Sequence, residues 1–369
     1  MRLLATLPLD PDFSGNTERQ VIQAGTLSAS LFRYPSGIAA LRIRNGRGSL
    51  IVLPWFGQMI WHAEFDGVDL TMRSGFEMPL PADSIGGTYG CFAFHSGLLR
   101  NGVPSAADTH AAHGEFPTAR MRRAWLELFD HDGMLALRVV SERDHVVGFG
   151  PHYLARPAVT LTEASGRFDI TLDVENRSGR PMELMYMAHV NFAFVAGGTI
   201  LQAAPFTPAQ VAVRTSIPAH VVPTDEYRAL IDTLAVTPER MQRLEEPASY
   251  DPEQVFYVSG LGTDATGRTA LMLRRPEGDA FVLEYAPSEF PFCVRWILNG
   301  PDQSVGAFAL PSTCLPEGYI AERARGHVRL LPPRGRTSFS VGLGHLDIPE
   351  SDAAATAIAA LQPPSEHRP

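Results

Sequence analysis

The sequence predicts a large β-sandwich or barrel with few helices, and three observations support this prediction. Short apolar runs are separated by turn-forming residues at intervals of about eight to twelve residues, as in all-β domains. The clearest pattern lies at 158–177, where two alternating segments flank the turn Ala164-Ser165-Gly166. The sequence has no internal repeat of fixed period, which argues against a propeller.

The first half of the chain is predicted to form strands in pairs. Weak patterning over 1–35 is typical of edge strands and loops, and Asp66-Gly67 is a hairpin turn signal. Apolar runs bounded by Gly and Asn are typical of buried strands. On this basis we expect strands at 38–44, 49–54 and within 54–71, and a further pair within 125–143.

Helical patterning is local in the second half. It predicts short helices at 224–234 and 238–246, and a terminal helix at 352–361 that is followed by a frayed tail at 362–369. The apolar share stays uniform along the chain, so we expect one domain over 1–369 with a core at about 36–347. Further strands are predicted at 254–260, 268–274, 280–285, 292–298 and 337–343.

The composition excludes several function classes. The net charge is -9 with histidine neutral, and nucleic acids and anionic membranes need a basic surface, so we expect neither as a partner. The chain contains no lysine, which excludes a lysine Schiff base, lysine-anchored pyridoxal phosphate and a P-loop lysine. The sequence also has no GxSxG motif and no GxGxxG that opens a helix after a strand.

The cysteines and the apolar runs indicate the cellular compartment in which the protein is expected. Cys91, Cys293 and Cys314 are far apart and odd in number, which indicates neither a disulfide framework nor a zinc knuckle. The N-terminal residues do not follow the pattern of a signal peptide, and no apolar run approaches the roughly 20 residues of a membrane helix. We therefore expect a soluble, cytoplasmic protein.

The stretch 94–117 is the densest group of ionisable side chains, and binding residues are often carried on loops of this kind. A solvated polar loop is the alternative interpretation. His110 and His113 form H-x-x-H, which alone is weak evidence for a metal, so we predict no metal site. The ionisable residues of the stretch are His95, Arg100, Asp108, His110, His113 and Glu115.

A second histidine lies in the apolar run 183–195. His189 and Asn191 are two residues apart, so in a strand their side chains share one face. A lone histidine in such a run is more often a core residue, but the paired Asn191 and the nearby Tyr186 favour a polar, concave face. Carboxylates that could complete a cleft with histidine and arginine are Asp251, Glu253, Glu317 and Glu322.

Together these stretches resemble the aldose 1-epimerase (galactose mutarotase-like) superfamily, most closely a branch largely of unknown function. HSGLLRNG precedes AAHGEFP, so His95 or Arg100 matches a substrate-binding position and His113 matches a histidine before glycine. MAHVNFAF is similar to the strand that carries the family's second histidine, which corresponds to His189. The resemblance covers about 36–347 and implies an all-β antiparallel β-supersandwich that acts on the α and β anomers of free sugars without a cofactor.

The carboxylates resemble the family less closely. A family aspartate before an apolar strand has its counterpart in YDPEQVF, where Asp251 matches by context and Glu253 by its distance to Phe256. The family's catalytic glutamate lies in an L-E-P-like motif, but here ALPSTC places Leu310 at that position. Leucine cannot accept a proton. Either Glu317 has taken over, or the chain has lost mutarotation.

The resemblance therefore suggests an enzyme that opens and recloses a sugar ring. The predicted catalytic residues are Glu317 as base, His189 as acid and His113 as a third member of the site. Trp55, Trp61 and Trp296 are candidates for stacking on a sugar face. The remaining predicted substrate-binding residues are His95, Arg100, His110, Asn191, Asp251 and Glu253.

Two alternatives stay open. One is a catalytically silent sugar-binding protein on the same fold, which the absence of the family glutamate favours. The other is a metal-dependent β-barrel sugar isomerase or lyase built on His95, His110, His113 and a glutamate. In each case the expected partner is a small-molecule sugar, and the sequence leaves the oligomeric state open, with a homodimer as one option.

Overall fold

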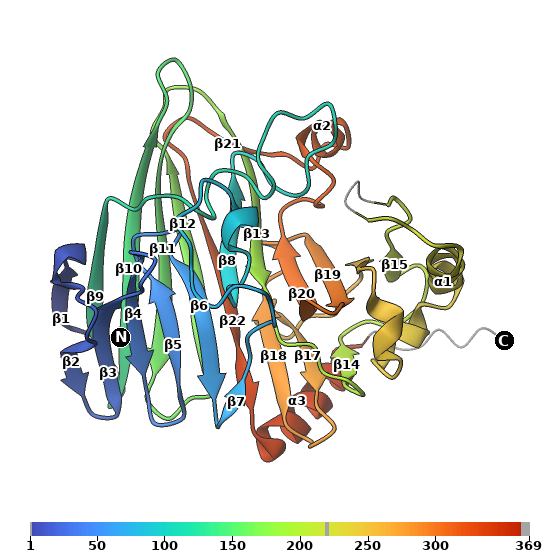
Figure 1. The fold of residues 1–369 in the computed structure, drawn as a ribbon, viewed down its shortest axis with the longest axis horizontal. Helices are drawn as coiled ribbons and strands as arrows, with labels where there is room; N and C mark the ends of the chain where they lie inside the picture. The colour runs from blue at the N-terminus through green and yellow to red at the C-terminus, as the bar shows by residue number, and fades with distance from the viewer. Residues whose placement is uncertain (1, 218–220, 363–369) are drawn as a thin grey trace.

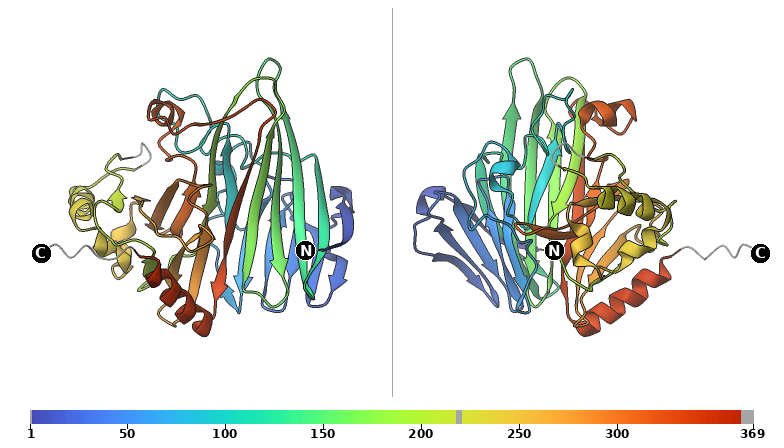
Figure 2. Two further views of the ribbon diagram at one scale, coloured as in Figure 1. Left: turned by 180° about the vertical axis from the view of Figure 1, so that it is seen from behind. Right: turned by 45° about the vertical axis from the view of Figure 1, so that its right-hand side comes forward.

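The computed structural model describes residues 2–217 and 221–362, which form two large antiparallel sheets packed face to face (Figure 1 and Figure 2). The main core lies between the sheets. Its aromatic rings meet across the interface, with Phe65 stacked on Phe168 at 5.8 Å and Phe192 on Phe281 at 5.2 Å between ring centroids. The predicted β-supersandwich is confirmed.

The nine-stranded sheet contains the hairpin that the sequence predicts most clearly. Val159 pairs with Ile170 and Leu161 with Phe168, and the buried residues of the second strand alternate with exposed Asp169 and Asp173, as expected. In spatial order this sheet consists of β1 (Arg2–Leu9), β9 (Arg123–His131), β10 (Met134–Val146), β11 (His152–Thr162), β12 (Arg167–Asn176), β22 (Arg336–Leu346), β18 (Ala280–Tyr285), β17 (Thr269–Arg274) and β14 (Thr199–Gln202).

The thirteen-stranded sheet carries the candidate site on the face turned away from the first sheet. The N-terminal strands β1 and β2 are edge strands, as the weak patterning of 1–35 predicts. In spatial order the sheet consists of β15 (Val211–Val213), β16 (Gln254–Val258), β19 (Phe292–Asn299), β20 (Ser304–Ser312), β13 (Met182–Val190), β8 (Ala93–Leu98), β6 (Met59–Phe65), β5 (Gly48–Leu53), β4 (Ala39–Arg44), β3 (Leu27–Arg33) and β2 (Arg19–Ala24), with β7 (Val68–Asp69) beside β6 and β21 (Arg329–Leu331) beside β13.

The helices agree with the sequence only in part. α1 (Asp225–Val236) is confirmed, with the Thr224 hydroxyl accepting from the amide of Tyr227 as an N-cap. The helix predicted at 238–246 is wrong. Only a 3₁₀ turn forms at Pro238–Gln242, because the chain then extends and Arg243 forms a β-bridge with Thr199.

The terminal helix α3 (Ile348–Ala360) begins four residues earlier than predicted, because Asp347 and Glu350 form a capping box there. The tail predicted over 362–369 lies outside the described residues except for Gln362. Neither α2 (Tyr319–Ala324) nor β20 was predicted. None of the helices within the described ranges is long and apolar enough to span a bilayer.

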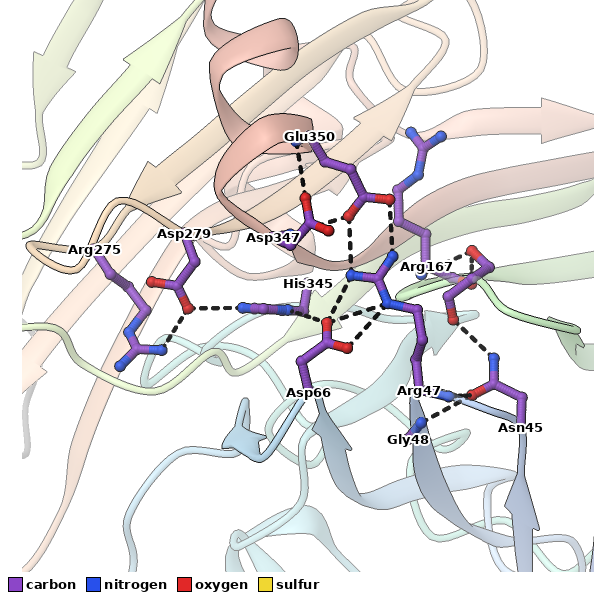
Figure 3. Close-up of polar contacts among 11 residues, drawn as sticks. Asn45, Arg47, Gly48, Asp66, Arg167, Arg275, Asp279, His345, Asp347 and Glu350 are labelled. Atoms are coloured by element: carbon purple, nitrogen blue, oxygen red, sulfur yellow. Dashed lines mark hydrogen bonds and ion pairs between the residues drawn. The ribbon is translucent and has the colours of Figure 1, made fainter.

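A polar network joins both sheets to the start of α3 (Figure 3). Arg47 contacts Asp66 at 2.6 Å and Glu350 at 2.8 Å, and the buried His345 lies between Asp66 and Asp279, with its nitrogens 2.7 and 2.8 Å from their oxygens. Burial opposes ionisation of Asp66, but hydrogen bonds from Arg47 and His345 outweigh it and lower the pKa of this carboxyl. The network holds the start of α3 against the sandwich.

Candidate functional site

A cavity of about 410 Å³ opens on the outer face of the thirteen-stranded sheet. Its floor is built by the neighbouring strands β16, β19, β20 and β13, and residues of the segments around 85–89, 103–113 and 316 add to its lining. Its volume is typical of a small-molecule site. The cavity is lined by Ile85, Gly86, Tyr89, Val103, Ala112, His113, Met187, His189, Arg214, Glu253, Val255, Val294, Trp296, Gln303, Leu310 and Pro316.

His189 reaches the cavity because side chains alternate along β13. Met187 and His189 face the cavity, whereas Ala188 and Val190 belong to the core between the sheets. As predicted, Asn191 lies on the same side, and its Oδ1 is 2.9 Å from Nδ1 of His189. Because the Asn191 amide donates to the Cys91 carbonyl, its oxygen accepts from the imidazole N–H at Nδ1.

This arrangement fixes the tautomer and the charge of His189. With the proton on Nδ1, Nε2 is an acceptor, and the Tyr89 hydroxyl donates to it at 3.2 Å. The ring is also stacked on Phe94 at 4.4 Å. Burial, reinforced by repulsion from His113, lowers the pKa of His189 well below 6.5, so the free protein holds a neutral imidazole here.

His113 approaches from the loop that follows β8. Its φ is +62°, and the next residue must be glycine, because a Cβ on Gly114 would lie 2.0 Å from the carbonyl oxygen of Arg100. The amide of His113 also donates to the Gly102 carbonyl. The His-Gly pair in the sequence thus marks a tightly folded loop that directs this imidazole to the cavity.

Hydrogen bonds also fix the tautomer of His113. The Ser96 hydroxyl donates to Oδ1 of Asn101, so the Ser96 oxygen accepts from Nδ1 of His113, 2.9 Å away. Nε2 then carries a lone pair that can accept a hydrogen bond from a ligand in the cavity. Burial lowers the pKa of His113 to about 4, although the charge of Glu253 opposes this shift. The His113 and His189 rings are perpendicular, with centroids 4.9 Å apart.

Of the predicted carboxylates, Glu253 lines the cavity. Trp296 donates to Oε2 at 2.5 Å, and Arg214 lies 3.2 Å from Oε1. Glu317, the predicted base, is outside the cavity lining, where its carboxylate accepts from the Tyr257 hydroxyl and lies 3.9 Å from Arg214. Arg214 therefore contacts both carboxylates. Only the Glu253 side chain lines the cavity, so Glu253 is the one that a ligand there can reach.

Leu310 is buried in the apolar floor of the cavity. It faces Val294 across the β19–β20 pair, and a register shift between Val294 and Trp296 accompanies this placement. The position that the resemblance gives to a proton acceptor is therefore part of the cavity, and it presents only methyl groups.

Four residues that the sequence predicts to bind substrate lie outside the lining of this cavity: His95, Asp251, Arg100 and His110. His95 faces the core between the sheets, because it alternates with the cavity-side Phe94 and Ser96 on β8, and its Nδ1 contacts the Tyr186 hydroxyl at 2.9 Å. Burial lowers the pKa of His95 to about 3. Asp251 is exposed, at the end of a short 3₁₀ turn. Neither position supports the predicted substrate contacts.

Arg100 and His110 line a separate, open groove of about 930 Å³. Arg100 stacks on the Tyr319 ring at 3.6 Å and pairs with Glu183 at 3.3 Å. Because the loop turns between them, His110 and His113 face different openings. The described ranges contain no group of three or more His, Cys, Asp or Glu arranged to hold a metal, and His95, His110 and His113, which the metal-dependent alternative requires, do not converge.

Tyr89 and Arg214 are cavity residues that sequence reasoning missed. Tyr89 directly follows the short 3₁₀ turn Ile85–Thr88, and Arg214 follows the three-residue strand β15, so neither lies in a recognisable motif. Of the three tryptophans considered for stacking, Trp296 lines the cavity, whereas Trp55 and Trp61 pack in other clusters. The Trp296 ring lies 5.8 Å from those of Tyr89 and His189.

Comparison with solved structures shows which fold this is. A "putative aldose 1-epimerase" from Klebsiella pneumoniae matches with a TM-score of 0.81 at 15% identity, over 98% of this chain and 97% of the other. Galactose mutarotase-like proteins from Clostridium acetobutylicum (TM-score 0.57, 14% identity, 87% and 99% covered) and Lactobacillus casei (0.52, 13%, 83% and 99%) match less closely. At these identities the likeness is one of fold.

The sequence itself places the chain in a family without an assigned activity. No curated protein matches the sequence significantly. The family model described as "Domain of unknown function (DUF4432)" matches residues 35–344. This match spans most of the chain, and the chain therefore belongs to the DUF4432 family, on the fold of the galactose mutarotase-like proteins.

Proposed function

We propose that this protein binds a monosaccharide in the cavity and interconverts its anomers by acid–base catalysis. The observation that carries the proposal is that His113, His189 and Glu253, from distant parts of the sequence, line one cavity of monosaccharide scale. The names of the structural neighbours point to the same chemistry, although at low identity.

In the proposed reaction, Glu253 accepts the proton of the C1 hydroxyl while His189 delivers a proton from Nε2 to the ring oxygen. The O–H electron pair forms the C1 carbonyl, and the electrons of the broken C1–O bond remain on the ring oxygen. Rotation of the aldehyde and the reverse proton transfers then give the other anomer. Trp296, which orients Glu253, also offers an aromatic face to the ring.

The protonation states set the pH dependence. His189 must carry a second proton to act as the acid, yet its pKa is well below 6.5, so the imidazolium is a minor form at neutral pH. Its population increases about tenfold for each pH unit by which the solution is acidified, until its pKa is reached. His113 stays neutral down to about pH 4 and can accept a hydrogen bond from a sugar hydroxyl at Nε2.

A silent sugar-binding protein is the second candidate, and Leu310 is the observation that favours it. The cavity has methyl groups where the resemblance places a base, and Glu253 is already engaged in an ion pair with Arg214. Such a protein would bind sugars in the same cavity without changing the rate of anomer exchange.

Magnetisation transfer between the C1 protons of the two anomers separates these candidates. We expect the protein to accelerate exchange for at least one monosaccharide, and the rate per enzyme to rise as the pH falls from 8 to about 6. Spontaneous exchange at each pH is the background to subtract. Saturable binding without acceleration would support the silent binder, and a rate that falls on acidification would contradict the role of His189.

A further inference from the structure

The cavity is divided into a polar side and an apolar floor. Val255, Val294, Leu310 and Met187 come from β16, β19, β20 and β13, which are neighbours in the sheet, and the four side chains belong to one apolar cluster, the apolar floor. Val294 and Leu310 are paired directly, whereas Val255 is opposite Trp296 and Met187 is opposite Ser312. Each of the four side chains is buried.

Such a floor selects against hydroxyl groups. A sugar hydroxyl placed on it would give up its hydrogen bonds to water and find no protein partner in exchange. A methyl group at the same place gains apolar contact instead. The hydrogen-bonding groups of the cavity, at Tyr89, His113, His189 and Glu253, border this floor, and the Tyr89 ring packs against it.

The charges also limit the ligand. Arg214 is the one permanently charged cation among the described residues that line the cavity, and it already contacts Glu253 at 3.2 Å and Glu317 at 3.9 Å. One guanidinium thus faces two carboxylates. A phosphate or carboxylate on the ligand would meet this net negative charge without an unpaired cation to offset it.

The proposed reaction places the floor relative to the sugar. If the C1 hydroxyl faces Glu253 and the ring oxygen faces Nε2 of His189, C5 and its substituent C6 lie on the side of the ring oxygen away from Glu253. Met187 is two residues from His189 on the same face of β13, and Leu310 and Val294 follow on the neighbouring strands. In that pose the group attached to C5 is the one directed to the apolar floor.

We propose that the ligand is an uncharged 6-deoxy sugar, whose methyl group packs on Val294 and Leu310 while its hydroxyls face the histidines and Glu253. This inference rests on the proposed function in that it takes the ligand to be a monosaccharide. It assigns a substrate class, whereas the proposed function assigns the reaction.

The test is calorimetric titration with matched sugars. D-fucose is compared with D-galactose, L-rhamnose with L-mannose, and 6-deoxy-D-glucose with D-glucose. We expect the best-bound 6-deoxy sugar to bind about 10- to 100-fold more tightly than its parent hexose. Galactose 6-phosphate and glucuronate should bind more weakly than the corresponding neutral sugars. Equal or tighter binding of the parent hexose, tightest binding of an anionic sugar, or no binding of any deoxy sugar would overturn the inference.

Two variants test the floor itself. Val294→Thr keeps the shape of the side chain and adds a hydroxyl, and Leu310→Asn adds a larger polar group; both should reduce the preference for the deoxy sugar, by about tenfold or more. Thermal unfolding shows whether each variant is folded, and V294T is the milder change. An unchanged preference in folded V294T would contradict the assignment.

Anomer exchange measured on the same samples separates this inference from the proposed function. A clear deoxy preference in binding without acceleration of exchange would uphold the substrate class and refute the catalysis. Acceleration with hexoses and no deoxy preference would uphold the catalysis and refute the substrate class.

Discussion

Replacing Glu253 by glutamine is expected to slow anomer exchange by about 10²–10⁴-fold, the contribution typical of a general base. The amide keeps the size of the side chain and can still accept from Trp296, but it cannot take the C1 hydroxyl proton. Glu317→Gln is the matched control, because it removes a carboxylate that pairs with the same Arg214 outside the cavity lining. We expect E317Q to change the rate by only a few-fold.

Magnetisation transfer at saturating sugar, together with calorimetric binding, measures both variants. Binding retained in E253Q while the rate collapses would identify a group needed for chemistry. The reverse ranking, with E317Q inactive and E253Q active, would show that the base predicted from the sequence is correct and that Glu317 reaches the sugar in the complex.

The second large effect concerns stability in acid. His95, His113 and His189 are buried, and burial lowers their pKa values to about 3, to about 4 and well below 6.5, respectively. In the unfolded chain a histidine has a pKa of about 6.5, so below that pH the unfolded state binds more protons than the folded state. The free energy of unfolding must therefore fall as the pH falls from about 6.5 towards 4.

The size of the loss is substantial. A shift of one pKa unit corresponds to about 1.4 kcal/mol. Acidification from pH 7 to pH 4 therefore lowers the free energy of unfolding by about 3 kcal/mol for a buried histidine such as His113 or His95. Urea unfolding at pH 7, 6, 5 and 4.5 measures the slope. A His95→Gln variant, which keeps a hydrogen-bonding side chain near Tyr186, should show a smaller slope, and a slope equal to that of the wild type would contradict the assignment.

The fold was predictable because its signals are local. Alternation along 167–176 places Phe168 and Ile170 on one face and Asp169 on the other whatever the rest of the chain does, and the structure confirms this pattern. The errors arose where tertiary contacts override local preference. The segment after Gln242 leaves a helical path to pair with Thr199, and β20, with Pro311 within it, lacks the usual pattern of a strand.

The candidate site was predictable only where a motif fixes its own geometry. His113 before a glycine and His189 two residues before Asn191 both reach the cavity. For His95 the sequence cannot tell which face of β8 is turned to the core, since apolar Phe94 and polar His95 and Ser96 are all buried. Arg214 lies at the cavity because β15 joins the edge of the sheet, a long-range pairing without a local signal.

A crystal structure of the protein with a sugar that it binds in solution tests the proposed site most directly. We expect the C1 hydroxyl within about 3.2 Å of the Glu253 carboxylate, and the ring oxygen at a similar distance from Nε2 of His189. We also expect C6 to contact Val294 and Leu310. A sugar bound in the groove beside Arg100 and His110, or one whose C1 hydroxyl faces the apolar floor, would contradict the proposed site.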